Sequence, residues 1–335
     1  MPTSREYVKA TACVASIVLL LVLIWFATDV LLLAFAGILA AIMLRAASDR
    51  LAQVLHVRAG LALGLVCLLL LCAAGLSFWF IAPRLSNEVD ALQQNIPSAW
   101  GQFLSWFHRS KWAGHLADKI QSEGIPYRHT AGTVLTAFSG LTSAIGGLVI
   151  VLFLALYFAL DPSLYVRGFL KLLPKGSEED GKEAINRCAE QLRRWLLGKL
   201  SLMVFVGIAT AVGLWAFDMP LILSLALLAA LLDFIPNIGP IISAAPAVLI
   251  AFTHSPAVAL EVAVLYLAVQ VVESYILQPL VQQRAVSLPP SVTLLSQVLM
   301  GTLFGPLGLV LATPLTVVVL TLTNTIYVQH ILHKA

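Results

Sequence analysis

The chain has 335 residues, of which 60% are hydrophobic and only 11% are charged, and its formal net charge is +3. Soluble domains carry about 25% charged residues, because their water-facing surfaces need polar cover. With this composition and a mean hydropathy of +0.93, the soluble globular, disordered and collagen-like classes are excluded. The small positive excess forms no dense basic run, so we expect a lipid bilayer as partner and no nucleic acid.

Residues 1–83 are predicted to hold membrane spans one to three. A basic N-terminus precedes an apolar run over residues 10–26, and only Thr28 and Asp29 separate this run from a second one over residues 30–44. We interpret the two runs as a retained signal-anchor hairpin, because no convincing cleavage site follows the first. After a short charged loop, 25 residues up to Pro83 carry no charge and are long enough for a third span.

Two segments of ordinary composition interrupt the apolar sequence. Residues 84–130 have apolar side chains at helical spacing, which predicts an extracytoplasmic segment of two amphipathic helices. Residues 131–160 form a predicted fourth span. Residues 161–199 hold eight Lys or Arg and six Asp or Glu, and a helix is expected to start at Ser177 and to lie along the membrane surface. Basic residues concentrated in the short loops place this segment and the N-terminus in the cytoplasm, which predicts a multi-pass membrane protein with its N-terminus inside.

Residues 200–335 are predicted to form a transport core, because their few charges lie inside apolar sequence. The charged residues of this region are Asp218, Asp233, Glu261, Glu273, Arg284 and Lys334. A charge facing lipid at the bilayer centre costs at least about 2.5 kcal/mol. The buried acids are therefore expected to face a cavity, a partner or each other.

Turn residues interrupt two apolar stretches of this core. Residues 219–252 are broken at 233–240, and residues 291–327 are broken at 304–308. Each proline frees carbonyl groups that lipid cannot satisfy, and secondary transporters build solute sites from such broken or re-entrant helices. Two ordinary helices kinked by proline are the alternative. The predicted hinge residues are Pro236, Gly239, Pro240, Gly305, Pro306, Gly308 and Pro314.

A polar stripe lies between the two breaks. Gln270, Ser274 and Gln278 follow each other at intervals of four, which places them on one helix face with Glu273 at its edge. The stripe and the first break together supply the candidate residues for holding a cation, taking up a proton or binding a solute hydroxyl: Asp233, Asn237, Gln270, Glu273, Ser274 and Gln278. In the purely structural interpretation, Asp233 caps a helix and Glu273 bridges to Arg284 or a backbone amide.

The sequence offers little support for an enzyme. It lacks the zinc-protease helix motif, the P-loop and the dinucleotide-binding glycine motif, and its four cysteines have no metal-ligand spacing. We therefore expect a protein that is not an enzyme, with no cofactor and no metal site.

The core motifs resemble those of the autoinducer-2 exporter (AI-2E) family of bacterial permeases. The resemblance rests on LDFIPNIGPIISAAPAVLIAF from Leu232, VESYILQPLVQQRAVSLPP from Val272, GTLFGPLGLVLATPL from Gly301 and the upstream RWLLGK from Arg194. It implies about eight membrane segments, a homo-oligomer that is suspected to be a pentamer, and export of small solutes such as autoinducer-2, or sodium/proton exchange. Ser274, where Asn is usual, and Pro306 depart from the family pattern.

Together these observations predict an all-α polytopic membrane protein with two broken or re-entrant hairpins in its C-terminal half. The expected function is gradient-driven or passive transport of a small solute, by alternating access to a mid-membrane site. A sodium or lithium/proton antiporter is the first alternative, since the intramembrane acids lie in a region without bases. A non-transporting scaffold that recruits a partner through residues 84–130 is the second.

Overall fold

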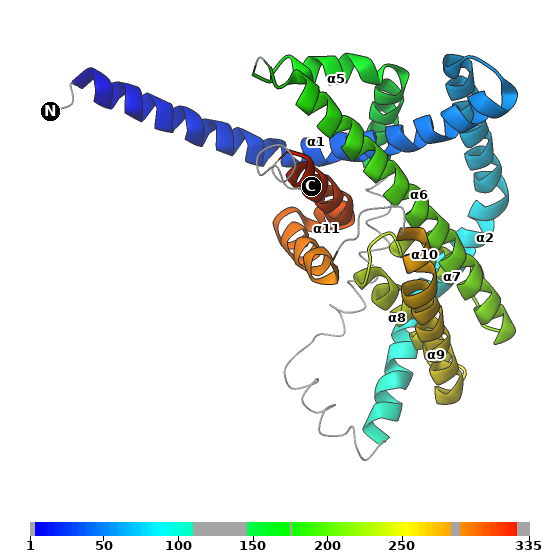
Figure 1. The fold of residues 1–335 in the computed structure, drawn as a ribbon. Helices are drawn as coiled ribbons and strands as arrows, with labels where there is room; N and C mark the ends of the chain where they lie inside the picture. Colours follow the sequence, from blue (N-terminus) through cyan, green and yellow to red (C-terminus); the bar gives the residue numbers. More distant parts are fainter. Residues whose placement is uncertain (1–3, 110–145, 175, 283–288, 327–335) are drawn as a thin grey trace.

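In the computed structural model, every regular element of the described residues, 4–109, 146–174, 176–282 and 289–326, is a helix (Figure 1). The elements are α1 (Ser4–Leu55), α2 (Ala59–Arg109), a helix over Gly146–Leu160, α5 (Pro162–Leu170), α6 (Glu178–Ala216), α7 (Ile222–Leu232), α8 (Ile238–Phe252), α9 (Pro256–Val272), a π-helical turn (Glu273–Leu277), α10 (Gln278–Gln282) and α11 (Pro290–Leu322). The expected all-α membrane fold is confirmed.

α1 is one continuous helix, so the hairpin expected at Thr28 and Asp29 is wrong. Its 52 residues correspond to about 78 Å at 1.5 Å per residue. Neither Thr28 nor Asp29 breaks a helix, because both keep their backbone N–H and no Gly or Pro stands beside them. In Figure 1 the first half of α1, in dark blue, extends away from the other helices, while its second half packs among them.

α2 also continues past the expected boundary at Pro83 and runs to Arg109 without a break. The second part of this helix packs against the core, where the rings of Phe103 and Phe252 meet edge to face at 5.2 Å. Glu88 accepts two hydrogen bonds of 2.8 Å, from the backbone N–H and the hydroxyl of Ser224 in the first turn of α7. Residues 110–130, the rest of the expected extracytoplasmic segment, lie outside the described residues.

The chain turns sharply after the helix Gly146–Leu160, because α5 follows it at an angle of 82°. Asp161 caps α5 by accepting a hydrogen bond from the backbone N–H of Leu164. Arg45 of α1 donates hydrogen bonds to the carbonyl oxygens of Ala159 and Leu160, at 2.6 and 3.0 Å. A cation at the end of a helix satisfies free carbonyls and favours the negative end of the helix dipole.

α6 starts after Ser177, as expected, but it does not end near Lys199. Its 39 residues join the charged segment 161–199 to the apolar core in one helix, so its second half is apolar enough to cross a membrane. The structure therefore differs from the expectation of a separate helix lying along the surface. One face of α6 exposes Val204, Ile208 and Val212, whereas Leu202, Val206 and Leu214 on another face are buried in the core.

The C-terminal half contains both predicted breaks. α7 and α8 have 11 and 15 residues, too few to cross a bilayer alone, and a non-helical turn joins them. In α11 the backbone leaves helical geometry at Gly305, and Figure 1 shows the helix changing direction between its orange and red parts.

The number of membrane segments is lower than expected in the part of the chain that the structure describes. Five helices are long and apolar enough to cross a membrane, or six when the bent pair around Asp161 counts as one span. The expected count of about eight is not confirmed. α7 and α8 are two of the segments that fall short of the length criterion.

Candidate functional site

The first break is a tight turn at the end of α7 that presents Asp233. The backbone N–H of Asp233 still bonds to Ala229, so the carboxylate projects from the last turn of α7. Asn237 then adopts φ +65° and ψ −49°, and α8 begins at the next residue. A Cβ at Gly239 would overlap the carbonyl oxygen of Leu232, so only glycine lets the two helices approach this closely.

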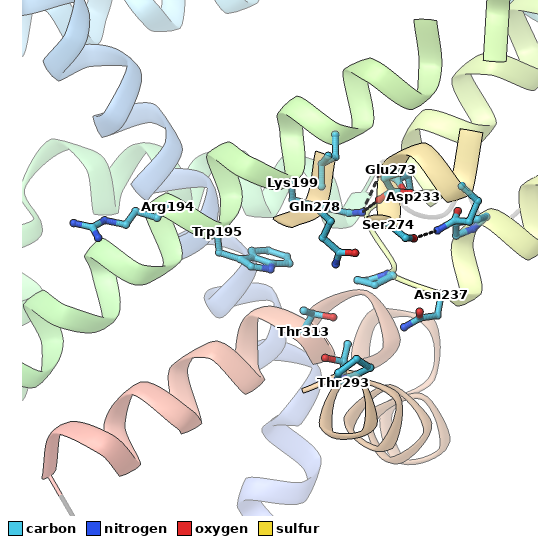
Figure 2. A pocket seen from close by; sticks show the side chains of 15 residues that line it. Arg194, Trp195, Lys199, Asp233, Asn237, Glu273, Ser274, Gln278, Thr293 and Thr313 are labelled. Carbon is cyan, nitrogen blue, oxygen red and sulfur yellow. Dashed lines mark hydrogen bonds and ion pairs between the residues drawn. The ribbon is translucent and has the colours of Figure 1, made fainter. Parts of the chain in front are cut away.

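Lys199 of α6 binds both buried acids of the core. Its Nζ lies 2.9 Å from Oδ2 of Asp233 and 3.4 Å from Oε1 of Glu273 (Figure 2). The three side chains are 7%, 1% and 6% exposed, so water screens them little. We refer to Lys199, Asp233 and Glu273 as the buried triad. With all three groups ionised, the triad carries one more negative than positive charge.

Glu273 stands where regular α-helix gives way to a π-helical turn over Glu273–Leu277. Such π-bulges are rare and frequently occur at functional sites. The polar stripe predicted on this helix exists, because the Gln270 side-chain amide donates a 2.9 Å hydrogen bond to the hydroxyl of Ser274.

A cavity of about 110 Å³ lies beside the triad, and all six predicted binding residues line it. These are Asp233, Asn237, Gln270, Glu273, Ser274 and Gln278, which come from the first break and the polar stripe. Seven further lining residues that the sequence analysis did not select are Arg194, Trp195, Lys199, Leu202, Pro290, Thr293 and Thr313. In Figure 2, Thr293 and Thr313 of α11 face the cavity from the side opposite the triad. We refer to this space as the triad cavity.

Two polar oxygen atoms of the cavity lining have no hydrogen-bond partner. Oδ1 of Asp233 and the hydroxyl of Thr313 are buried without one, although Asp233 Oδ2 binds Lys199. Buried polar atoms normally have partners, because an unmade hydrogen bond there costs about 1–3 kcal/mol. The two atoms are therefore suited to bind a solute or a water molecule in the cavity.

α11, the helix that carries the second break, contacts the first break. Gly305 has φ +63° and ψ −152°, a conformation that is essentially restricted to glycine. A Cβ at Gly308 would overlap the Met300 carbonyl oxygen, which repeats the close approach seen at Gly239. The side-chain amide of Gln297 in α11 donates a 2.9 Å hydrogen bond to the carbonyl of Pro236.

The other predicted hinge residues lie at the same two breaks. Pro236 and Pro240 line the triad cavity, Pro306 follows Gly305 directly, and Pro314 is fully buried inside α11. Arg284, the predicted structural partner, lies outside the described residues. Among the described residues, no group of three His, Cys, Asp or Glu side chains is placed to hold a metal ion.

Lys199 was not among the predicted site residues, because it stands at the end of a segment that was expected to be water-exposed. The apolar stripe of α6 continues through Leu192, Trp195 and Leu196, and a helical period of 3.6 places Lys199 on the same buried face. The sequence therefore contained a signal for a buried ion pair. Lys199 lies on the apolar face of a helix, and the region that follows it in sequence contains acids but no base before Arg284. Trp195 packs this face of α6 against the first break, because its ring meets that of Phe234 edge to face at 5.7 Å.

Comparison with known proteins links this architecture to transport. Residues 14–327 match the family model described as AI-2E family transporter. The chain is 29% identical over 249 residues to the putative transport protein YrrI of Bacillus subtilis, covering 70% of this chain and 69% of that protein. It is 26% identical over 258 residues to the putative transport protein YueF of the same organism, at 71% and 69% coverage.

The name of a third relative states which compound that relative transports. The chain is 29% identical over 193 residues to the AI-2 transport protein TqsA of Escherichia coli, covering 57% of this chain and 56% of that protein. The family match extends over most of the sequence and includes both breaks and every member of the buried triad. The chain therefore belongs to the AI-2E transporter family and is a multi-pass membrane protein.

Proposed function

We propose that this protein exports a small, hydroxylated solute such as autoinducer-2 across the bacterial inner membrane, with its N-terminus in the cytoplasm. The site of transport is the triad cavity, and the protein works as a homo-oligomer. The family assignment supports transport in general, and the name of TqsA supports the solute class. The cavity chemistry supports the position of the site.

One observation carries this proposal: six polar residues, selected for their type and spacing, line one and the same cavity. That cavity also holds two unpartnered oxygen atoms, on Asp233 and Thr313. A solute hydroxyl can donate a hydrogen bond to Oδ1 of Asp233, and the Thr313 hydroxyl can donate or accept one. Sites that bind a hydroxyl in this way reject solutes that lack it, because their polar groups then stay unpaired.

The size of the cavity supports alternating access. Pockets for drug-sized ligands have about 300–1,000 Å³. The triad cavity has about 110 Å³, which suits only a few non-hydrogen atoms. A larger solute enters when the α7–α8 turn and α11 move apart. Gln297 and Pro236 form a hydrogen bond across this contact, which breaks in such a motion.

The cation/proton antiporter is less well supported than solute transport. It was favoured because the intramembrane acids lie in a region of the sequence without bases, but Lys199, which precedes that region, neutralises part of their charge at 2.9 and 3.4 Å. The scaffold alternative gains no support either, since α2 packs against the core as far as Phe103.

The test is transport by purified protein in liposomes loaded with autoinducer-2. Wild type is expected to release the solute faster than empty liposomes do, and Asp233→Asn and Glu273→Gln are expected to abolish release while the proteins still insert and assemble. Near-normal rates in both variants would contradict the proposed site. In parallel, a trapped pH dye reports proton flux on addition of sodium or lithium. Proton flux in wild type without solute release would instead support the antiporter.

A further inference from the structure

A second, larger cavity of about 720 Å³ lies between the first half of α6 and the end of α11. All its lining residues except Leu320 are of polar or charged type: Glu179, Lys182, Glu183, Asn186, Arg187, Glu190, Gln191, Arg194, Leu320, Thr321, Asn324 and Thr325. We refer to it as the vestibule. Arg194 lines both the vestibule and the triad cavity, so this one residue is common to the two linings.

α6 connects the two spaces as one continuous helix. From Glu179 in the vestibule to Lys199 in the triad cavity, the helix rises by about 30 Å. Figure 2 shows Arg194, Trp195 and Lys199 along the same helix, with the Arg194 side chain extending away from the triad.

We propose that the vestibule is the aqueous entrance to the triad cavity, and that the ion pair of Arg194 with Glu190 selects solutes at the junction of the two. Nε of Arg194 lies 2.7 Å from Oε1 of Glu190, and each side chain is about half exposed. Because its two charges cancel, the pair favours neither cations nor anions over small polar solutes of zero net charge. This inference rests on the proposed transport function and adds the route and the charge selectivity.

The charges of the vestibule are balanced. Its lining contains three acids and three bases, and Glu183 pairs with Arg187 in the same i, i+4 arrangement as Glu190 with Arg194. A region of one sign would attract ions of the opposite sign. A balanced lining gives an ion of either sign no net attraction, whereas a neutral solute with hydroxyl groups finds both donors and acceptors.

The vestibule also contains a buried hydrogen-bond acceptor that has no partner in the protein, close to Arg194. Oε1 of Gln191 is buried and has no hydrogen-bond partner. Gln191 lies between Glu190 and Arg194 in sequence, and all three line the vestibule. A buried acceptor without a protein partner is normally satisfied by water or a ligand.

Thiol labelling tests the route without knowledge of the solute. In a variant whose four cysteines are replaced, Ser274→Cys places a thiol in the triad cavity, and Asn324→Cys places one in the vestibule as the matched control. A cationic and an anionic methanethiosulfonate reagent of similar size are added to sealed vesicles, from the side on which α6 begins. Both thiols are expected to react from this side.

The charge of the junction then determines which reagent reaches position 274. Arg194→Gln leaves Glu190 unpaired and is expected to raise the cationic-to-anionic rate ratio there by roughly fivefold, the effect of two unit charges about 4 Å apart in water. Glu190→Gln is expected to lower the ratio by a similar factor. Arg194→Lys keeps the charge and is expected to leave the ratio unchanged.

Two results would overturn the inference. One is a thiol at 274 that stays unreactive from this side while the thiol at 324 reacts. The other is a rate ratio at 274 that neither Arg194→Gln nor Glu190→Gln changes. If Arg194→Gln does not fold, the shift in Glu190→Gln decides. Either result alongside normal autoinducer-2 release would refute the route but leave the proposed function intact, whereas the predicted labelling without release by wild type would refute the function.

Discussion

Removal of the cation from the buried triad is predicted to destabilise the protein strongly. Lys199→Met keeps most of the side-chain volume but leaves two carboxylates that are 1% and 6% exposed without their partner. At an effective dielectric constant of about 20, the Nζ–Oδ2 distance of 2.9 Å and the Nζ–Oε1 distance of 3.4 Å correspond to attractions of about 6 and about 5 kcal/mol. Desolvation of the charges offsets part of this gain, so the expected loss is about 3–5 kcal/mol.

The assay is the free energy of unfolding in mixed micelles, measured by titration with SDS and followed by tryptophan fluorescence. Lys182→Met is the matched control, because it makes the same substitution on an exposed position of α6. This variant is expected to change the free energy of unfolding by less than about 0.5 kcal/mol. Equal stability of Lys199→Met and Lys182→Met would refute the account of the triad as a tightly coupled charge cluster.

Three further predictions concern positions that shape the core. Gly239→Ala is expected to reduce the yield of folded protein sharply, because the added Cβ would overlap a backbone carbonyl at the end of α7. Gly301→Ala is the control and is expected to be tolerated, because its Cβ meets only side-chain atoms at 3.5 Å. Size-exclusion profiles distinguish the two variants, and equal profiles would contradict the tight turn. Glu88→Ala removes the hydrogen-bond acceptor at the start of α7 and is expected to lower the free energy of unfolding by about 0.5–2 kcal/mol. Asp90→Ala is the control and is expected to cause no change. An unaffected SDS midpoint in Glu88→Ala would show that the cap is not formed. Arg45→Met frees two helix-end carbonyls and is expected to increase proteolysis near the bend at residue 161, and a wild-type digestion rate would contradict its role as a cap.

The sequence predicted the local features of the core well. The breaks at 233–240 and 304–308 follow from proline and glycine, whose backbone limits act on their immediate neighbours. The polar stripe of Gln270, Ser274 and Gln278 follows from helical periodicity alone. These features needed no knowledge of which helices pack together.

Long-range contacts and helix ends were predicted less well. Lys199 is separated by 34 and 74 residues from its two acidic partners, so the local sequence does not show the ion pairs. From the charged residues that precede it, Lys199 was predicted to belong to a water-exposed segment. The same reasoning placed boundaries at residues 83 and 199, where the polarity of the sequence changes. Polarity reports which solvent a helix faces and does not itself end a helix, so α2 and α6 continue through both boundaries.

The most direct test of the account separates the stability of the triad from its function. The triple variant Lys199→Met, Asp233→Asn and Glu273→Gln removes all three charges of the triad, and its unfolding free energy is expected to recover to within about 1 kcal/mol of wild type. In liposomes loaded with autoinducer-2, this folded variant is predicted to release no solute above the rate of protein-free liposomes. Release at the wild-type rate would show that the charges of the triad have no part in transport, and would contradict the account.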